Sequence, residues 1–311
     1  MHKIALVTDS PSLPIDYDMP LLIEACESAG LVVEVRPWDD AGVEWGAYDA
    51  VVIRSPWSYV ERLSDFLTWC EDVSSCCRLF NPVSVVRWNL NKRYMSDLAQ
   101  WGTPIVPTSF VAHNDDAETA IRKIFSIHLH VDNFVVKPTV GAYSHGVKRF
   151  SRGSEEDAVK HVTQIIKSGR EAMLQPYVDA IDETGETDLI FFNGEYSHAI
   201  RKSALLLSDG TVNVPSQDVR MARDAEPEER AVALNALNAA VSCLGLDDPL
   251  LYARLDLVRS DDGSPVVLEM EVCEPSLSLP FTDVGAKRFA EALVKKVSDF
   301  AVDMRPGVTR L

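Results

Sequence analysis

The sequence predicts a mixed fold, α/β in its first part and α+β toward its C-terminus. Short apolar runs alternate with helically spaced segments from the N-terminus onward, which is typical of a parallel sheet covered by helices. The last part of the chain instead carries two pairs of strand-like runs, joined by Asn193-Gly194 and Asp262-Gly263, which favour hairpin turns. A chain of 311 residues is long enough for two or three domains.

The first unit, residues 1–88, is predicted to be a small α/β domain. Its apolar runs predict strands and its helically spaced segments predict helices, with strands at 3–8, 31–36 and 48–54 and helices at 19–29 and 63–73. The unit contains no G-x-G-x-x-G, so it does not indicate a dinucleotide site.

Two further units follow, which gives predicted domains of 1–88, 89–175 and 176–311. Residues 89–175 predict helices at 91–102, 115–125 and 154–169, strands at 104–111 and 133–138, and a further segment at 173–179. Residues 176–311 predict hairpins at 186–202 and 252–272 and helices at 227–245 and 286–301.

Composition and charge exclude several kinds of partner. The net charge of −17 disfavours nucleic acid and anionic membranes, which bind basic patches. We expect no membrane span, because no run of about 18 apolar residues occurs, and no signal peptide. The six cysteines show no C-x-x-C spacing, which favours reduced thiols in a cytoplasmic protein. The oligomeric state stays open, a homo-oligomer included.

The stretch FVVKPTVGAYSHGV (134–147) places Lys137 at the end of a predicted buried strand. The lysine precedes the glycines, so the order is not that of a P-loop, and the chain lacks the H-R-D and D-F-G of a protein kinase. A nucleotide still suits the stretch, because an ammonium group neutralises phosphate oxygens and a glycine loop can close over them. The alternative is a lysine that extends from a strand end into solvent.

Carboxylates concentrate on the second predicted hairpin. Glu269 and Glu271 are two residues apart in one strand, and Arg254 and Asp256 are two apart in the other, so each pair shares a face. The three acids would repel one another without a cation, and oxygen ligands at that density suit Mg²⁺. The alternative is a solvated strand face, because VVLEMEV alternates apolar and acidic residues.

From about residue 85 onward the sequence resembles the ATP-grasp carboxylate–amine ligases. The resemblance rests on six motifs in order: N-L-N-K at 89–92, V-V-K-P at 135–138, L-Q-P-Y-V at 174–178, A-I-R-K at 199–202, A-R-L-D at 253–256 and L-E-M-E-V at 268–272. It implies an ATP-grasp fold with an N-terminal Rossmann-like pre-ATP-grasp domain, and an enzyme that uses ATP and Mg²⁺.

The resemblance also implies which residues bind ATP. Lys92 and Lys137 would bind the α- and β-phosphates. The loop after Lys137 would form a lid, with contacts to the nucleotide from Gly141, Ser144, His145 and Gly146. A solvated loop histidine is the alternative for His145.

Residues 175–178 would form the hinge of the ATP site. Its backbone groups would contact adenine, from Gln175, Pro176, Tyr177 and Val178. An acid after the hinge would bind the ribose hydroxyls, and we expect Asp182 rather than Asp179 or Glu183.

At the reacting end, the resemblance implies that Arg201 and Arg254 hold the γ-phosphate and an acyl phosphate formed from it. Asp256, Glu269 and Glu271 would hold two Mg²⁺ ions. The usual metal motif of the family is Glu-x-Asn, and this chain has Glu-Met-Glu instead. A carboxylate ligates Mg²⁺ at least as well as an amide oxygen, so the departure adds charge without removing the site.

The departure also marks a branch of the family. R-S-P-W-S-Y (54–59), the run at 81–94 and L-E-M-E-V-C-E-P-S-L (268–277) resemble the enzymes that cyclise O-ureido-D-serine to D-cycloserine. The implied function is an ATP-dependent ligase that activates a small amino-acid-like carboxylate and captures it with an amine of the same molecule. The alternatives are a ligase that joins two amino acids, and a module that senses ATP without turnover.

Candidate substrate residues follow from the expected sheet edge. Arg54 and Ser55 end a predicted strand, and ligands of open α/β sheets lie beyond such ends. We expect Arg54 to bind the substrate carboxylate, with Trp57 as a wall, although a surface arginine and a packed tryptophan are equally compatible. Three further candidates lie after the first strand and after the metal strand: Asp9, Glu274 and Ser276.

Overall fold

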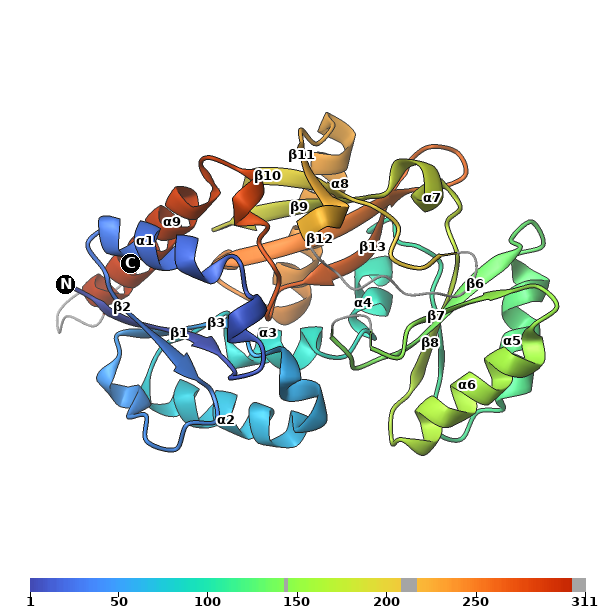
Figure 1. The fold of residues 1–311 in the computed structure, drawn as a ribbon, viewed down its shortest axis with the longest axis horizontal. Coiled ribbons are helices and arrows are strands. Elements are labelled where there is room, and N and C mark those ends of the chain that lie inside the picture. The colour runs from blue at the N-terminus through green and yellow to red at the C-terminus, as the bar shows by residue number, and fades with distance from the viewer. Residues whose placement is uncertain (143–144, 208–216, 304–311) are drawn as a thin grey trace.

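The computed structural model describes residues 1–142, 145–207 and 217–303, so Ser144 lies outside the described residues. These residues form three sheets, and Figure 1 shows them side by side with the third sheet between the other two along its upper part. None of the helices in these ranges is long and apolar enough to cross a membrane.

The first sheet is parallel and confirms the α/β expectation for the N-terminal unit. Its order is β2 (Val32–Pro37), β1 (Lys3–Thr8), β3 (Ala50–Ser55), β4 (Leu79–Phe80). Helix α1 (Met19–Ser28) packs on one face and α2 (Leu63–Cys76) on the other, because alternate residues of β1 join two different apolar clusters. Short 3₁₀ helices cover the connections, at Leu13–Ile15, Trp45–Ala47 and Trp57–Glu61.

The second sheet is antiparallel and carries two helices on one face. Its order is β5 (Ser109–Val111), β8 (Ala172–Pro176), β6 (Asn133–Pro138), β7 (Lys148–Ser151). Helices α5 (Ala117–Ile127) and α6 (Glu155–Lys167) pack together over it, to the right in Figure 1. Strand β5 is shorter than expected.

The third sheet contains both predicted hairpins. Its antiparallel order is β11 (Arg220–Arg223), β10 (Glu195–Lys202), β9 (Glu186–Phe192), β12 (Tyr252–Arg259), β13 (Pro265–Glu271). The turn residues Asn193 and Gly194 have φ of 51° and 78°, the left-handed values that a type I′ turn requires. The remaining helices are α3 (Val83–Asn89), α4 (Tyr94–Gln100), α7 (Ala180–Thr184), α8 (Pro227–Leu244) and α9 (Gly285–Asp303), with 3₁₀ turns at Gln217–Val219 and Leu279–Phe281.

Two helices pack across the predicted domain limits. Helix α4 buries Tyr94, Met95 and Leu98 with α8 and the third sheet, although we expected it in the second unit. Helix α9 packs against α1 and places Phe289 in a cluster with residues of β1. The divisions at 88/89 and 175/176 therefore stay predictions. What the packing does show is that the first and third units share a core, which fixes the loops between them.

Candidate active site

A pocket lies where the three units meet. Its walls include Trp57 and Tyr59 from the first unit, Lys137 and Gln175 from the second, and many residues of the third sheet. Five carboxylates line it: Glu186, Asp256, Glu269, Glu271 and Glu274. Four of these five are candidates from the sequence, three on the second hairpin and Glu274 after it.

Strand register brings the charged groups together. Arg254 of β12 lies opposite Glu271 of β13, and Asp256 lies opposite Glu269. On the other side of β12, Asp256 also lies opposite Asp188 of β9. Because opposite residues of an antiparallel pair share a face, four acids and one arginine converge there.

Arg254 forms the central ion pairs of this face. Its Nε and Nη2 donate to Asp256 Oδ1 at 2.7 Å and Oδ2 at 3.0 Å, and its Nη2 lies 2.6 Å from Glu271 Oε1. Burial raises the pKa of Glu271 to about 8, although the positive charge of Arg254 acts to lower it. The guanidinium group is therefore oriented from two sides, which preorganises it for an anion in the pocket.

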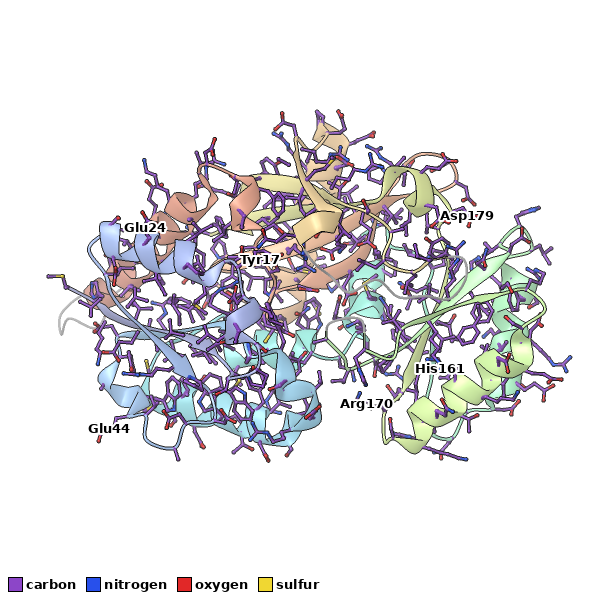
Figure 2. All side chains as sticks on the ribbon, viewed as in Figure 1. Tyr17, Glu24, Glu44, His161, Arg170 and Asp179 are labelled. Atoms are coloured by element: carbon purple, nitrogen blue, oxygen red, sulfur yellow. The ribbon has the colours of Figure 1, made fainter. Side chains whose placement is uncertain are left out.

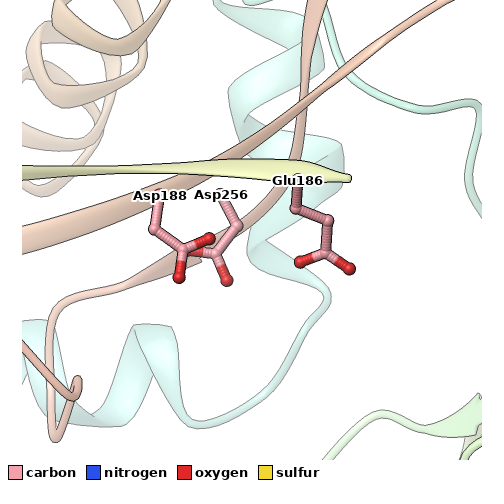
Figure 3. Close-up of side chains that lie close together, drawn as sticks. All are labelled: Glu186, Asp188 and Asp256. Atoms are coloured by element: carbon pink, nitrogen blue, oxygen red, sulfur yellow. The ribbon is translucent and has the colours of Figure 1, made fainter. Parts of the chain in front are cut away.

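Lys202 lies among three carboxylates, two of which, Asp188 and Asp256, also form ion pairs with Arg254. Its Nζ is 2.7 Å from Glu186 Oε2, 3.3 Å from Asp256 Oδ2 and 3.4 Å from Asp188 Oδ1. Figure 3 shows the three acids pointing to the same side of adjacent strands, and one oxygen of each lies within 4.8 Å of the others. This trio shares only Asp256 with the predicted metal set.

The side chain of Asp188 supports a divalent cation near this trio. It is fully buried, and neither of its oxygens accepts a hydrogen bond from the described residues. Burial and the neighbouring Asp256 raise its pKa. A buried carboxylate without hydrogen bonds is costly, and oxygen atoms of this kind are the ligands that Mg²⁺ takes. The residues present therefore fit the metal that the sequence predicts.

The two predicted phosphate-binding lysines converge on one acid. Lys92 Nζ lies 2.8 Å from Glu269 Oε1, and Lys137 Nζ lies 3.3 Å from Glu269 Oε2. Burial alone would raise the pKa of Glu269, but Lys137 and Lys92 lower it below its ordinary value. The carboxylate is thus held ionised beside two cations, and both lysines face the pocket.

The hinge residues line the far end of the pocket. Gln175, Pro176, Tyr177 and Val178 all contribute to the wall. Asp182 is not part of the wall: its carboxylate accepts from Arg149 Nη1 at 3.0 Å and from the Tyr177 hydroxyl. A ribose at this end would therefore meet an acid that already has two partners.

The lid residues lie close to Lys92 and Lys137. The ammonium group of Lys92 donates to the Gly141 carbonyl at 3.2 Å, and both Gly141 and His145 line the pocket. His145 is exposed, and its backbone N–H donates to the Ala142 carbonyl. Gly146 has φ of +76°, and a Cβ there would lie 3.3 Å from Pro138, so the turn after the lid requires glycine.

Arg201 does not reach the pocket. Successive residues of a strand point to opposite faces, so Lys202 takes the pocket face and Arg201 the other. The Arg201 guanidinium instead donates to the Glu183 carbonyl at 2.5 Å. The structure therefore places Lys202, and not the predicted Arg201, at the pocket wall; the role predicted for Arg201 stays a prediction.

Arg54 differs most from its expected place. It is 1% exposed, its Nη2 donates to the Pro275 carbonyl at 2.8 Å, and its guanidinium lies 5.1 Å from the Tyr252 ring centre. The third unit covers the edge of the first sheet, so an arginine that ends β3 is enclosed between them. Arg54 therefore lies outside the pocket wall, and its predicted contact with a substrate carboxylate stays a prediction that its position does not support.

Asp9 and Ser55 also lie outside the pocket wall. Asp9 accepts from the Ser12 backbone N–H at 2.7 Å and from the backbone and hydroxyl of Ser58 at 2.8 and 2.7 Å. The Ser55 hydroxyl donates to Thr8 at 2.9 Å. Asp9 therefore connects two loops at the edge of the first sheet, and Ser55 connects the ends of β1 and β3; their predicted contacts with a substrate stay predictions.

The predicted residues Trp57, Glu274 and Ser276 do line the pocket. The indole N–H of Trp57 donates to the Glu274 carbonyl at 2.9 Å. Ser276 shares a hydrogen bond of 2.8 Å with the hydroxyl of Tyr17, a residue just before α1 that faces the third sheet (Figure 2). Together they form an end of the pocket between the first and third units.

The segment after β13 is held by buried polar contacts. Asp18 is 1% exposed and accepts from the backbone N–H groups of Leu277 at 2.6 Å and Leu279 at 2.7 Å. His198 Nε2 donates to the Leu277 carbonyl at 2.8 Å, and its Nδ1 accepts from Ser197. Burial lowers the pKa of His198 to about 4.

His198→Gln is expected to flatten the fall in stability on acidification. The folded pKa of about 4 lies below the ordinary 6.5, so the unfolded chain binds the proton first as pH falls. The stability that neutral His198 contributes is fully present above pH 6.5. As the pH falls toward 4, this contribution to the free energy of unfolding is lost, by about 2.5 kcal/mol at pH 4.5. Urea unfolding at pH 7 and pH 4.5 measures this. The difference in free energy of unfolding between wild type and variant should be smaller at pH 4.5, and the same difference at both pH values would contradict the prediction.

Sequence reasoning missed Glu186, Asp188 and Lys202. The signal was present, because E-T-D at 186–188 repeats the two-residue spacing of Glu269 and Glu271, and the first hairpin places Lys202 opposite Glu186. What the sequence did not reveal is that β9 and β12 are neighbours, since their hairpins are separated by a helix. Tyr17 and Tyr59 carried no comparable pattern.

The fold and this pocket define the class of the protein. D-alanine–D-alanine ligase from Bacillus anthracis superposes with a TM-score of 0.63 over 98% of this chain and 100% of that one, at 13% identity. PsnB, an ATP-grasp ligase solved with a precursor peptide and AMPPNP, has a TM-score of 0.60, 14% identity and coverage of 94% and 97%. The fold is the ATP-grasp fold, and the protein is an ATP-dependent ligase.

More similar proteins identify the family. The cycloserine biosynthesis protein DcsG of Streptomyces lavendulae is 53% identical over 297 residues, covering 96% of this chain and 99% of that one. The crystal structure of D-cycloserine synthetase DcsG has a TM-score of 0.92 at 53% identity, covering 95% of this chain and 99% of that one. Residues 4–81 match the family model of the N-terminal domain of D-cycloserine synthetase DcsG. This chain belongs to the D-cycloserine synthetase family.

Proposed function

We propose that this protein closes O-ureido-D-serine into D-cycloserine with ATP. The observation that carries the proposal is the 53% identity to a cycloserine biosynthesis protein across almost the whole of both chains. The pocket supports it, because cations and acids for phosphoryl transfer line the same pocket as Tyr17, Trp57 and Ser276. We expect a small amino-acid-like substrate and no larger partner.

The pocket residues divide by role. Lys92 and Lys137 bind the α- and β-phosphates, and the hinge binds adenine, with Asp182 turning to the ribose. Arg254 and Lys202 neutralise the γ-phosphate, with Lys202 in the role that the family resemblance implied for Arg201. Glu271 and Asp256 hold Arg254 so that its donors are fixed before the charge develops on the transferring group.

Magnesium completes the charge balance of this site. Asp256, Glu269 and Glu271 would hold two ions, and the buried Asp188 adds oxygens beside Asp256. Bound Mg²⁺ would neutralise phosphate oxygens during the transfer. The ammonium groups of Lys92, Lys137 and Lys202 already lie against these carboxylates, so cations and acids are interleaved as a polyphosphate requires.

The reaction balances in three steps. A substrate carboxylate oxygen attacks the γ-phosphorus and ADP leaves, which gives an acyl phosphate. The nitrogen bonded to the ether oxygen then attacks the acyl carbon, loses its proton and expels phosphate, and a five-membered ring closes. That nitrogen still carries a carbamoyl group, which water must remove as carbon dioxide and ammonia for D-cycloserine to form.

One experiment tests this function. Purified protein is incubated with Mg²⁺, ATP and O-ureido-D-serine, and ADP, ammonia and the product mass are followed. Equal release of ADP and ammonia with the mass of D-cycloserine is the expected result. ADP release only with a pair of amino acids would replace ring closure by intermolecular ligation. ATP binding without turnover of any small amino acid would instead favour an ATP sensor.

A further inference from the structure

One acid of the pocket differs from the other four. Glu186, Asp256, Glu269 and Glu271 each lie within 4 Å of a lysine or arginine. Among the residues described by the structure, no such cation lies against Glu274. The positive charge of Lys92 acts on Glu274 to lower its pKa, but the Lys92 ammonium group already pairs with Glu269 at 2.8 Å.

The surroundings of Glu274 fix its position. The Tyr59 hydroxyl hydrogen-bonds its side chain, and Trp57 binds its backbone carbonyl at 2.9 Å. The next residue, Pro275, is held by the buried Arg54, and Leu277 by the buried Asp18. These contacts come from two separate segments of the first unit, the run 54–59 and the residue before α1. A carboxylate held this firmly at a pocket wall is preorganised for a ligand.

The negative charge of Glu274 is not neutralised by a cation within ion-pair distance among the described residues. Burial raises its pKa, which shows that the pocket disfavours the bare carboxylate. A half-buried acid that lacks a cation is stabilised when a ligand supplies one. Glu274 follows Glu271 by three residues, so their Cα atoms are at most about 11 Å apart. A cation bound there stands close to the centre where a carboxylate is phosphorylated.

We propose that Glu274 binds the α-ammonium group of the substrate and thereby restricts the enzyme to amino acids. This inference rests on the proposed function, which supplies a substrate with a carboxylate at the reacting centre and an ammonium group one carbon away. The carboxylate lies toward Arg254 and Lys202, and the ammonium group lies toward Glu274. Two oppositely charged ends thus fix the orientation of a small zwitterion.

The test compares two ligands that differ only in the amino group. O-ureido-D-serine and its des-amino counterpart, 3-(ureidooxy)propanoate, are titrated calorimetrically into protein holding Mg²⁺ and a non-hydrolysable ATP analogue. Wild type should bind the amino acid about 10- to 100-fold more tightly, as expected for a charge-assisted hydrogen bond in a partly buried site. Glu274→Gln should reduce this ratio to about 3 or less.

Matched variants complete the design. Glu24→Gln makes the same chemical change on the outer side of α1 (Figure 2) and should keep the wild-type ratio. Glu274→Asp keeps the charge and should retain part of the selectivity, which a purely structural role would not predict. An unchanged ratio in Glu274→Gln would overturn the proposal. A kcat that falls equally for both compounds, with loss of the acidic limb of the pH profile, would also overturn it and make Glu274 a base.

The outcome is separable from that of the proposed function. If wild type releases no ADP with O-ureido-D-serine, ring closure fails as the function. The ratio is then measured with whichever amino acid supports ADP release and with its des-amino counterpart. A Glu274-dependent ratio would still support the ammonium site, and a Glu274-independent ratio would still overturn it.

Discussion

Asp256→Asn is expected to lower kcat by about a thousand-fold or more while the protein stays folded. Asp256 accepts two hydrogen bonds from Arg254 and lies 3.3 Å from the ammonium group of Lys202. It is also the one acid common to the predicted metal set and to the trio with Glu186 and Asp188. Asparagine keeps the shape but removes the charge that both cations and Mg²⁺ need, and each lost electrostatic contact in such a site costs about 10²–10³ in rate.

The measurement separates this role from a loss of structure. Asp261→Asn is a matched control, because Asp261 lies exposed in the turn of the same hairpin. The kcat for ATP turnover with the amino acid substrate should fall about a thousand-fold in Asp256→Asn and stay near the wild-type value in Asp261→Asn. Mn²⁺ binding in the presence of an ATP analogue, followed by electron paramagnetic resonance, should weaken only in Asp256→Asn. A near-normal kcat for Asp256→Asn would remove Asp256 from the metal site.

The sequence of a single hairpin predicts which residues of one strand share a face. Residues two apart share a face, so Arg254 pairs with Asp256 and Glu269 with Glu271 in this sense. The turn at Asp262-Gly263 sets the register only as far as Leu257, which lies opposite Val267; a register shift between Leu257 and Asp256 then places Asp256 opposite Glu269, and this shift carries no signal in the sequence. The strand-then-loop pattern likewise placed Lys137 at the pocket.

The parts that depend on contacts between units could not be predicted in this way. Arg54 ends a strand of the first sheet, and an isolated sheet would expose it there. Helix α9 and the segment after β13 cover that edge, so Arg54 is buried against Tyr252 and Phe289. Nothing near Arg54 in the sequence signals that covering. The pairing of β9 with β12, which adds Asp188 to the site, is long-range in the same sense.

Lys202→Met is expected to destabilise the protein by about 3–5 kcal/mol, the effect of removing one partner from a buried ion pair. The Lys202 ammonium is the cation closest to Glu186, and it also lies against Asp188 and Asp256. Burial would lower its pKa, but the three acids raise it well above its ordinary value. Its loss leaves three buried carboxylates, of which Asp188 and Asp256 still lie 3.8 and 2.7 Å from Arg254.

The same arrangement predicts two ways to recover that stability, and both follow from charge. Adding Asp188→Asn to Lys202→Met removes one uncompensated carboxylate and should restore about 1–2 kcal/mol, since the two residues are in contact and their effects do not add. Millimolar Mg²⁺ should stabilise Lys202→Met more than wild type, because the ion can take the place of the ammonium group. Urea unfolding of the three proteins with and without Mg²⁺ measures both effects. Additive losses in the double variant, with no difference in the response to Mg²⁺, would mean that Lys202 stabilises the fold through packing and not through the charge of the acid trio.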